Sequence, residues 1–246
     1  MQHAKLCPDL ALLCEPERCD AGKQLLSKLG IAGNAPVFGV IPNSRCVEHG
    51  VTPLSDTTQY FRLLRTAVAW AVKKDFQVVG ISHMIGTDRD VKLLGDLNIP
   101  IFHSNSATEV RSVVANLSAA ACSRYHGLVN CIVHGVPAVA LGWHPKYRGI
   151  MDLFDAVEFD HPLDDCDIAL EERLNSIFEQ RDELVEKSKG KLDKAHDTIR
   201  KSMNSMSISV GGPEVVLAGR VPVADVVKRP PSILQKLRRK LSGYLK

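Results

Sequence analysis

An arginine and a histidine occur together directly after an apolar run, in the stretch Ser123-Arg124-Tyr125-His126-Gly127. Arginine offers a planar fork of donors that matches a carboxylate or a phosphate, and histidine exchanges a proton near neutral pH. A helix that opens at Gly127 adds the partial positive charge of its N-terminus. The stretch therefore predicts an anion site with an acid or base attached. An arginine paired with a nearby aspartate, beside a histidine bonded into a turn, is the alternative.

Three more basic side chains follow apolar runs elsewhere in the chain. They are Arg45, after residues 37–41; His83, after residues 78–82; and Lys146, after residues 138–142. Each is a candidate to contact the same anion. For Arg45 and Lys146 the alternative is a solvated surface cation.

Other polar residues close to these candidates are expected to have structural roles. Asp88 and Asp90 precede a helical pattern, so we expect them to cap that helix rather than to take part in chemistry. His126, Asn130 and His134 share one helix face, but no carboxylate or fourth ligand accompanies them. We therefore expect no metal site.

The elements that position these side chains alternate along the chain. Short apolar runs lie at residues 37–41, 78–82, 101–103, 120–123 and 138–142, and helical patterns lie between them at 57–74, 88–97, 108–117 and 127–134. This alternation predicts βα units around a parallel sheet. Open α/β sheets bind ligands at the carboxyl ends of their strands, where all the basic candidates fall. We expect an α/β fold, a Rossmann-like parallel sheet of five or six strands flanked by helices.

The segments on either side of this alternation predict further elements. Before it we expect a strand or extended segment at 9–14 and a helix at 21–29; after it, a short helix at 147–154, an edge strand at 156–159 and one long helix from 168 to about 199. The pattern changes near residue 203. Residues 232–245 place leucine and isoleucine at helical spacing with basic residues between them, which is typical of a basic amphipathic helix. We expect one domain at 36–202 and a C-terminal extension at 203–246.

Composition limits the class of protein. The net charge of +3 depends on the C-terminus, because residues 229–246 hold basic side chains and no acidic one, which leaves the rest of the chain slightly acidic. An acidic body argues against nucleic acid as a partner. The seven cysteines are scattered, odd in number and never spaced as C-x-x-C, which indicates reduced thiols in a cytoplasmic protein. We expect neither a secretory signal nor a membrane span.

Residues 36 to about 160 resemble the polysaccharide pyruvyl transferase family, most closely between Cys122 and Asp155. In that interval an R-x-H-(G/A) turn, a helix that ends in a G-V-P motif, a hydrophobic strand and a P-K pair follow in the order and spacing typical of the family. The resemblance implies transfer of the enolpyruvyl group of phosphoenolpyruvate to two sugar hydroxyls as a pyruvate ketal. The implied acceptor is a cell-surface polysaccharide or its lipid-linked precursor.

The same resemblance implies roles for the candidate residues. It implies that Arg124 and His126 contact phosphoenolpyruvate, with His126 as the general acid or base, and that Arg45 and His83 occupy positions where the family has an arginine and a histidine. Lys146 follows the proline of the P-K pair and is our further candidate for the phosphate. The donor is a substrate, and no cofactor is implied.

Members of this family generally have two Rossmann-like domains with the site between them, as in the GT-B fold. The chain resembles the C-terminal, donor-binding half only, with residues 1–35 as a remnant of the segment that crosses from the first domain. We expect the acceptor-binding half to be missing, through truncation, through a wrongly started reading frame, or because it is a separate partner. The chain alone is then expected to bind the donor without completing the transfer.

Two other functions stay open at this point. One is the nucleotide-sugar half of a GT-B glycosyltransferase or epimerase, although such halves tend to have a glycine-rich diphosphate turn that is not evident here. The other is a noncatalytic module that docks on the anionic inner face of a membrane through residues 232–245. Binding of the donor would distinguish them, since a scaffold has no need of an anion pocket.

Overall fold

A parallel sheet forms the centre of the protein. The computed structural model describes residues 7–14, 19–48, 57–84 and 86–209. The sheet has six strands in the order β3-β2-β1-β4-β5-β6, and every neighbouring pair is parallel. The strands are β1 (Val37–Ile41), β2 (Gln77–Ile81), β3 (Ile101–Phe102), β4 (Ala119–Cys122), β5 (Ala138–Gly142) and β6 (Asp160–Pro162). The predicted α/β, Rossmann-like fold is confirmed.

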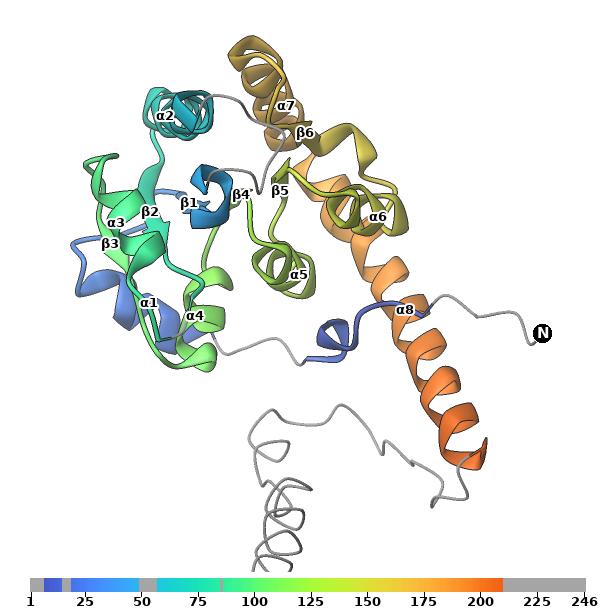
Figure 1. Ribbon diagram of the computed structural model, residues 1–246. Helices are drawn as coiled ribbons and strands as arrows, with labels where there is room; N and C mark the ends of the chain where they lie inside the picture. The colour runs from blue at the N-terminus through green and yellow to red at the C-terminus, as the bar shows by residue number, and fades with distance from the viewer. Residues whose placement is uncertain (1–6, 15–18, 49–56, 85, 210–246) are drawn as a thin grey trace, which may run out of the picture.

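Helices cover both faces of the sheet (Figure 1). On one face α2 (Thr57–Lys73) packs against α7 (Asp167–Glu179), and on the other α1 (Cys19–Ser27) packs against α4 (Ala107–Val114) next to α5 (Tyr125–Val133). Because both faces are covered, β1 and β4 are buried along their whole length. Strands buried on both faces appear in a sequence as continuous apolar runs, which is why these were predictable.

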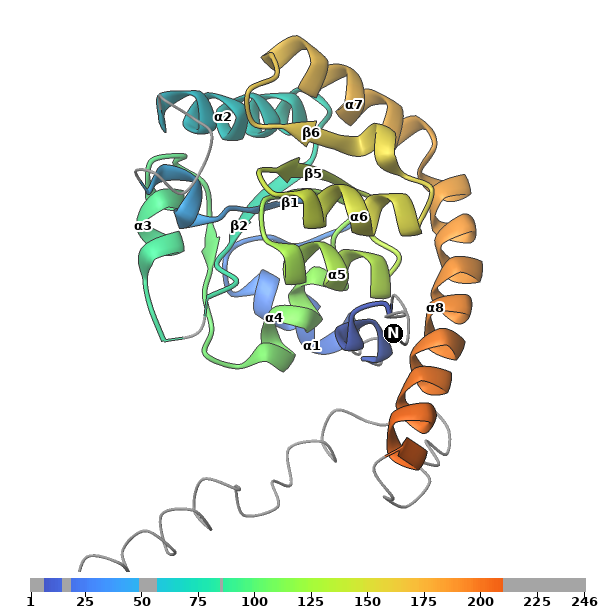
Figure 2. The ribbon, with the colours of Figure 1, turned by 45° about the vertical axis from the view of Figure 1, so that its right-hand side comes forward.

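Three more helices complete the layers. Helix α3 (Arg89–Gly95) contacts β3, α6 (Pro145–Leu153) contacts β5 and β6, and α8 (Arg181–Ser209) runs along the side of the molecule. Figure 2 shows α8 extending from the end of α7 past α5. Within the described part of the chain, no helix is both long and apolar enough to cross a membrane.

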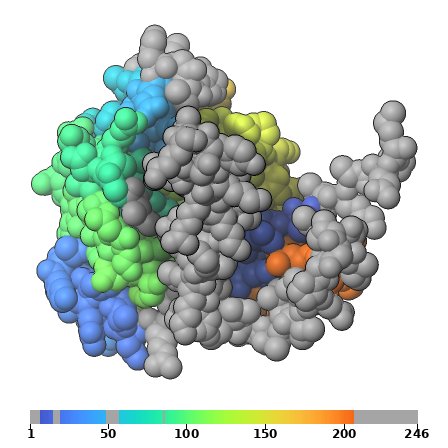
Figure 3. Space-filling model, turned by 60° about the horizontal axis from the view of Figure 1, so that its bottom comes forward, coloured from blue at the N-terminus to red at the C-terminus, as the bar shows by residue number. Residues whose placement is uncertain are grey.

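The predicted strand or extended segment at residues 9–14 is wrong. Residues Leu10–Leu13 form the 3-10 helix η1, because Asp9 caps the turn by accepting a hydrogen bond from the Ala11 amide (2.8 Å). The turn directs Leu12, which is fully buried, into the core, and the Leu12 carbonyl oxygen lies 2.7 Å from His196 Nε2 of α8. Figure 3 shows η1 in dark blue against the orange surface of α8.

The sixth strand lies four residues later than predicted. Residues Val157–Phe159 form a 3-10 helix, η3, and β6 begins at Asp160, opposite Ala140 of β5. The physical reason is the exit from α6, where the Ala156 amide donates to the Met151 carbonyl oxygen (2.9 Å). The chain cannot become extended until this turn is complete.

The single long helix predicted from residue 168 is two helices. Helix α7 ends at Glu179 with Gln180 as its C-cap, and α8 begins at Arg181. No glycine or proline marks the break. Because the helical pattern continues across it, periodicity could not show that α7 packs on α2 while α8 packs beside α5 and η1. Helix α8 also continues beyond residue 203, and the predicted amphipathic helix at 232–245 lies outside the described residues.

Candidate functional site

The order of the strands creates a crevice at the carboxyl edge of the sheet. Chain order reverses between β1 and β4, which pair directly through Ile41 and Cys122 at their carboxyl ends. The connection after β1 leads to β2 on one side, and the connection after β4 leads to β5 on the other. Open α/β sheets bind ligands at such a switch point. Arg45 follows β1 and Arg124 follows β4, so both belong to the two loops that flank it.

The N-terminus of α5 lies directly on these strand ends. The helix begins at Tyr125, two residues earlier than predicted, with Arg124 as its N-cap residue. Gly127 permits the close approach: a Cβ there would lie 2.8 Å from Cys122 Sγ and 3.0 Å from Ile41 Cγ2. The unpaired amides and partial positive charge of the first turn therefore lie at the switch point.

Arg124 is held by a buried carboxylate. Its Nη2 donates to Asp90 Oδ1 (2.7 Å) and its Nε to Asp90 Oδ2 (3.1 Å). The Asp90 side chain is 0% exposed, and it also accepts a hydrogen bond from the Ser44 amide (3.0 Å). The expectation that Asp90 caps α3 is therefore wrong. Asp88 occupies the N-cap position of that helix, but its side chain makes no capping hydrogen bond.

A buried network of hydroxyl groups supports the same edge of the sheet. The Tyr60 hydroxyl donates to Ser123 Oγ (2.8 Å) and accepts from the Asn43 amide (2.9 Å). The Tyr147 hydroxyl donates to the Ser123 carbonyl oxygen (2.6 Å). Burial raises the pKa of both tyrosines well above the ordinary value, so both hydroxyls stay protonated donors. The network joins the loops after β1 and β4 to α2 and α6.

His83 lies beside these groups as a neutral imidazole. The side-chain amide nitrogen of Asn130 lies 2.8 Å from His83 Nε2 and donates to it, so that ring nitrogen is the acceptor. Burial, with a smaller contribution from the nearby Arg124 guanidinium, lowers the pKa of His83 to about 4. His83 therefore lies at the predicted edge, but as a hydrogen-bonding group rather than as a cation.

His126 differs from His83 in its exposure. It is the second residue of α5, and its side chain is 62% exposed. Its Nε2 lies 3.7 Å from Oδ2 of Asp9, the residue that caps η1. A histidine on the first turn of a helix, open to solvent and with a carboxylate nearby, is free to exchange a proton with a ligand at this edge.

Lys146 lies among aromatic rings. Its Nζ is 5.3 Å from the ring centroid of Tyr125, 5.5 Å from that of Tyr147 and 5.8 Å from that of Trp143. These contacts hold the ammonium group against the N-termini of α5 and α6 without neutralising its charge. His144 caps α6 and accepts a hydrogen bond from the Lys146 amide (3.3 Å).

Arg45 is exposed, and no hydrogen bond or ion pair joins its side chain to another described residue. It belongs to the 3-10 helix η2 (Ser44–Val47), one residue after Ser44, which contacts both Asp90 and Arg124. The structure thus brings Arg124, His83 and His126 together. It places Lys146 on the neighbouring helix and Arg45 on the adjoining loop.

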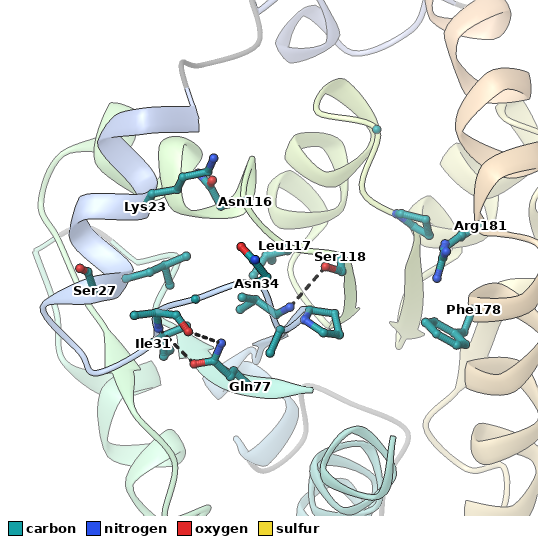
Figure 4. Close-up of a pocket in the computed structure, with 18 of the residues that line it drawn as sticks. Lys23, Ser27, Ile31, Asn34, Gln77, Asn116, Leu117, Ser118, Phe178 and Arg181 are labelled. Atoms are coloured by element: carbon teal, nitrogen blue, oxygen red, sulfur yellow. Dashed lines mark hydrogen bonds between the residues drawn. The ribbon is translucent and has the colours of Figure 1, made fainter. Parts of the chain in front are cut away.

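A cavity opens at the opposite edge of the sheet, where the strands begin (Figure 4). Its volume is about 700 Å³, and none of the predicted site residues lines it. Two of the polar side chains around it are engaged with neighbours: the Gln77 side chain bonds the Ala32 amide and carbonyl (3.1 and 2.9 Å), and the Arg181 guanidinium stacks on the Phe178 ring at 5.1 Å. Because ligands of open α/β sheets bind at the carboxyl edge, we assign the candidate site to that edge.

Two residues of the candidate site were not predicted from the sequence, Asp90, which pairs with Arg124, and Asn130, which bonds His83. One signal was present for Asp90. The buried residues Leu93 and Leu94 lie one helical turn further along α3, so Asp90 lies on the buried face of that helix, where a carboxylate needs a charged partner. The sequence places Asn130 on one helix face with His126 and His134, and nothing in its spacing indicates a contact with His83.

A comparison with protein-family models identifies the family of the chain. The family model for polysaccharide pyruvyl transferase matches residues 1–145, which is more than half of the chain. The search among curated proteins found no match to the chain. The match begins ahead of residue 36, so it includes the segment that we expected to precede the domain, and it ends one residue before Lys146. It covers Arg45, His83, Arg124 and His126. The chain therefore belongs to the polysaccharide pyruvyl transferase family, a family of transferases.

Proposed function

We propose that the chain binds phosphoenolpyruvate at the carboxyl edge of its sheet and takes part in transferring the pyruvyl group to a sugar. The observation that supports this most directly is the convergence at the β1/β4 switch point of the Arg124 guanidinium, the exposed His126 and the N-terminus of α5. A fork of donors, a proton carrier and unpaired amides suit a small anion that must be protonated.

The reaction requires one proton donor and strong anion binding. A sugar hydroxyl attacks the enol carbon, the methylene carbon takes up a proton, and the bond from the enol carbon to the phosphate oxygen breaks to release inorganic phosphate. A second sugar hydroxyl then closes the ketal. His126 is our candidate for the proton transfers, because it is exposed and at the site. His83 is assigned a hydrogen-bonding role, since its lowered pKa leaves it unprotonated near neutral pH.

Arg124 alone does not balance the negative charge of phosphoenolpyruvate. The Arg124 guanidinium is already neutralised by Asp90, so it contributes orientation and hydrogen bonds more than net charge. The uncompensated cations at this edge are Lys146 and Arg45, which make no ion pair with a described carboxylate. We assign the phosphate to these side chains and to the N-termini of α5 and α6.

The acceptor in this proposal is a sugar of a cell-surface polysaccharide or of its lipid-linked precursor. Donor binding is the part of the reaction that the described residues support, and we assign acceptor binding to a further domain or a partner. We place the protein in the cytoplasm, because the six cysteines whose side chains the structure describes are free thiols. Peripheral docking of residues 232–245 on an anionic membrane remains part of the proposal.

Calorimetric titration of phosphoenolpyruvate into the purified chain tests the proposal. We expect saturable binding that weakens by about ten- to 100-fold in Arg124→Ala, the equivalent of losing one hydrogen bond to a charged group at about 1.5–3 kcal/mol. Arg62→Ala is the matched control, because Arg62 forms only an exposed ion pair with Asp167. A UDP-sugar serves as the control ligand. Binding of the UDP-sugar in place of phosphoenolpyruvate, or equal affinity in Arg124→Ala, would contradict the proposal.

A further inference from the structure

Asp90 is a fully buried carboxylate that the reaction as proposed does not use. It is the second residue of α3, with a side chain that is 0% exposed. Carboxylates are almost never fully buried unless they are paired, and Asp90 is paired with two separate segments. It accepts from Arg124 after β4 and from the Ser44 amide after β1, while α3 itself follows β2. One carboxylate therefore joins the loops that follow three neighbouring strands.

We propose that Asp90 is a positioning residue, which fixes the guanidinium of Arg124 so that its free donors are held ready for the anionic donor substrate. This inference rests on the proposed function and adds to it a residue that does not itself contact the substrate. The hydrogen bonds made by the Arg124 guanidinium support this role. Asp90 occupies the edge of the guanidinium formed by Nε and Nη2, and the Pro42 carbonyl oxygen (3.3 Å) and Ser44 Oγ (3.5 Å) accept from the same two nitrogens.

The remaining edge of Arg124 is available to a ligand. Guanidinium carries donors on Nε, Nη1 and Nη2, and no hydrogen bond links Nη1 to a described residue. The side chain is 18% exposed, so a ligand can reach it. A carboxylate or phosphate that binds along Nη1 meets a guanidinium whose orientation Asp90 has already fixed. The Arg124 side chain therefore loses little conformational freedom on binding.

Asp90 has two opposing effects on anion binding. Whether the affinity for the anion rises or falls when the charge of Asp90 is removed therefore tests the proposal. The negative charge of Asp90 repels an anion, so a purely electrostatic influence predicts tighter binding when that charge is removed. Positioning predicts weaker binding, because Arg124 then samples other rotamers. Asp90→Asn changes the charge with little change in shape. It retains an oxygen that can accept from the Ser44 amide.

The experiment is a double-mutant cycle with phosphoenolpyruvate as the titrated ligand. We measure dissociation constants for the full chain, Asp90→Asn, Arg124→Ala and the double variant. We expect Asp90→Asn to weaken binding at least about tenfold in the presence of Arg124 and to weaken it no further in the Arg124→Ala background, since coupled residues are not additive. Unchanged or tighter binding in Asp90→Asn would overturn the proposal, as would an equal loss in both backgrounds.

Chemical rescue provides a readout that a merely structural role would not change. Free guanidinium ion at millimolar concentration is added to Arg124→Ala, where it can occupy the vacated place beside Asp90. We expect it to restore phosphoenolpyruvate binding in Arg124→Ala and not in the double variant. Equal rescue in both variants would overturn the proposal.

A second variant keeps the test valid if Asp90→Asn does not fold. Arg124→Lys retains a positive charge next to Asp90 but lacks the second edge of donors. We expect a near-native melting temperature with binding weakened at least about tenfold; native-like affinity would overturn the proposal. A full chain that binds no phosphoenolpyruvate would refute the proposed function together with this inference. Normal binding by the full chain, weakened binding by Arg124→Ala and unweakened binding by Asp90→Asn would refute the role of Asp90 alone.

Discussion

Gly127→Ala tests whether the approach of α5 to the sheet is as close as the structure shows. The added Cβ would lie 2.8 Å from Cys122 Sγ, 3.0 Å from Ile41 Cγ2 and 3.2 Å from Arg124 Cβ. Cys122 and Ile41 are fully buried at the ends of the two central strands. Cys122 Sγ also donates to the Arg124 carbonyl oxygen (3.1 Å), so turning it aside breaks that contact, and we expect α5 to shift outward instead.

Two energies compete in this substitution. Overpacking a core position costs typically about 1–3 kcal/mol. Alanine is a better helix former than glycine by about 1 kcal/mol in a helix interior, and by less in a first turn. Because the close contacts are to fully buried groups, the steric cost exceeds the gain in propensity, and we expect a net loss of about 1–2 kcal/mol. For a chain of this length each kcal/mol lowers the melting temperature by about 2–4 °C.

Urea unfolding followed by circular dichroism measures this loss, and Gly149→Ala is the matched control. Gly149 lies in α6, a helix of the same nine-residue length as α5, and a Cβ there meets nothing within 4 Å. We expect Gly149→Ala to be neutral or slightly stabilising, and Gly127→Ala also to weaken phosphoenolpyruvate binding. If both variants were equally stable, α5 would not lie as close to β1 and β4 as the steric reasoning requires.

The remaining predictions concern the buried polar groups. Tyr60→Phe leaves Ser123 Oγ and the Asn43 amide without their partner, so we expect a loss of about 1–3 kcal/mol in the free energy of urea unfolding; an unchanged value would show that water replaces the hydroxyl. The pKa of His83 falls from its ordinary 6.5 to about 4 in the folded chain, so the unfolded chain takes up the proton first on acidification. The stability from neutral His83 is therefore complete above about pH 6.5 and lost as the pH falls towards about 4. His83→Gln should make the fall in urea midpoint over that range shallower than in the wild type, and an identical pH dependence would contradict the assigned protonation state.

The sequence alone determined the class of fold and the edge of the sheet to which the candidate site is assigned. The strands around residues 37–41 and 138–142 are buried on both faces and therefore stand out as continuous apolar runs. Because parallel strands all end at one edge, the position of Arg124, His83 and His126 just after their strands was enough to bring them to the same side of the sheet. These inferences needed only local pattern and one rule about parallel sheets.

The sequence predicts the ends of helices and strands less well where tertiary packing decides them. The break between α7 and α8 has no glycine or proline, because it is set by which surface each helix can cover and not by local propensity. The same holds for the segment at 9–14. Its apolar residues fit a strand or a turn equally well, and the space for Leu12 beside α8 selects the turn.

Only the tertiary structure decided which groups meet and in what state of charge. Asp90 lies in α3, after β2, and Arg124 lies 34 residues later, after β4; His83 and Asn130 are 47 residues apart. Their contacts depend on the reversal of strand order between β1 and β4, which no local pattern encodes. In the packed molecule Asp90 compensates the charge of Arg124, and burial keeps His83 uncharged, since desolvation is a property of the packed molecule and not of the residue type.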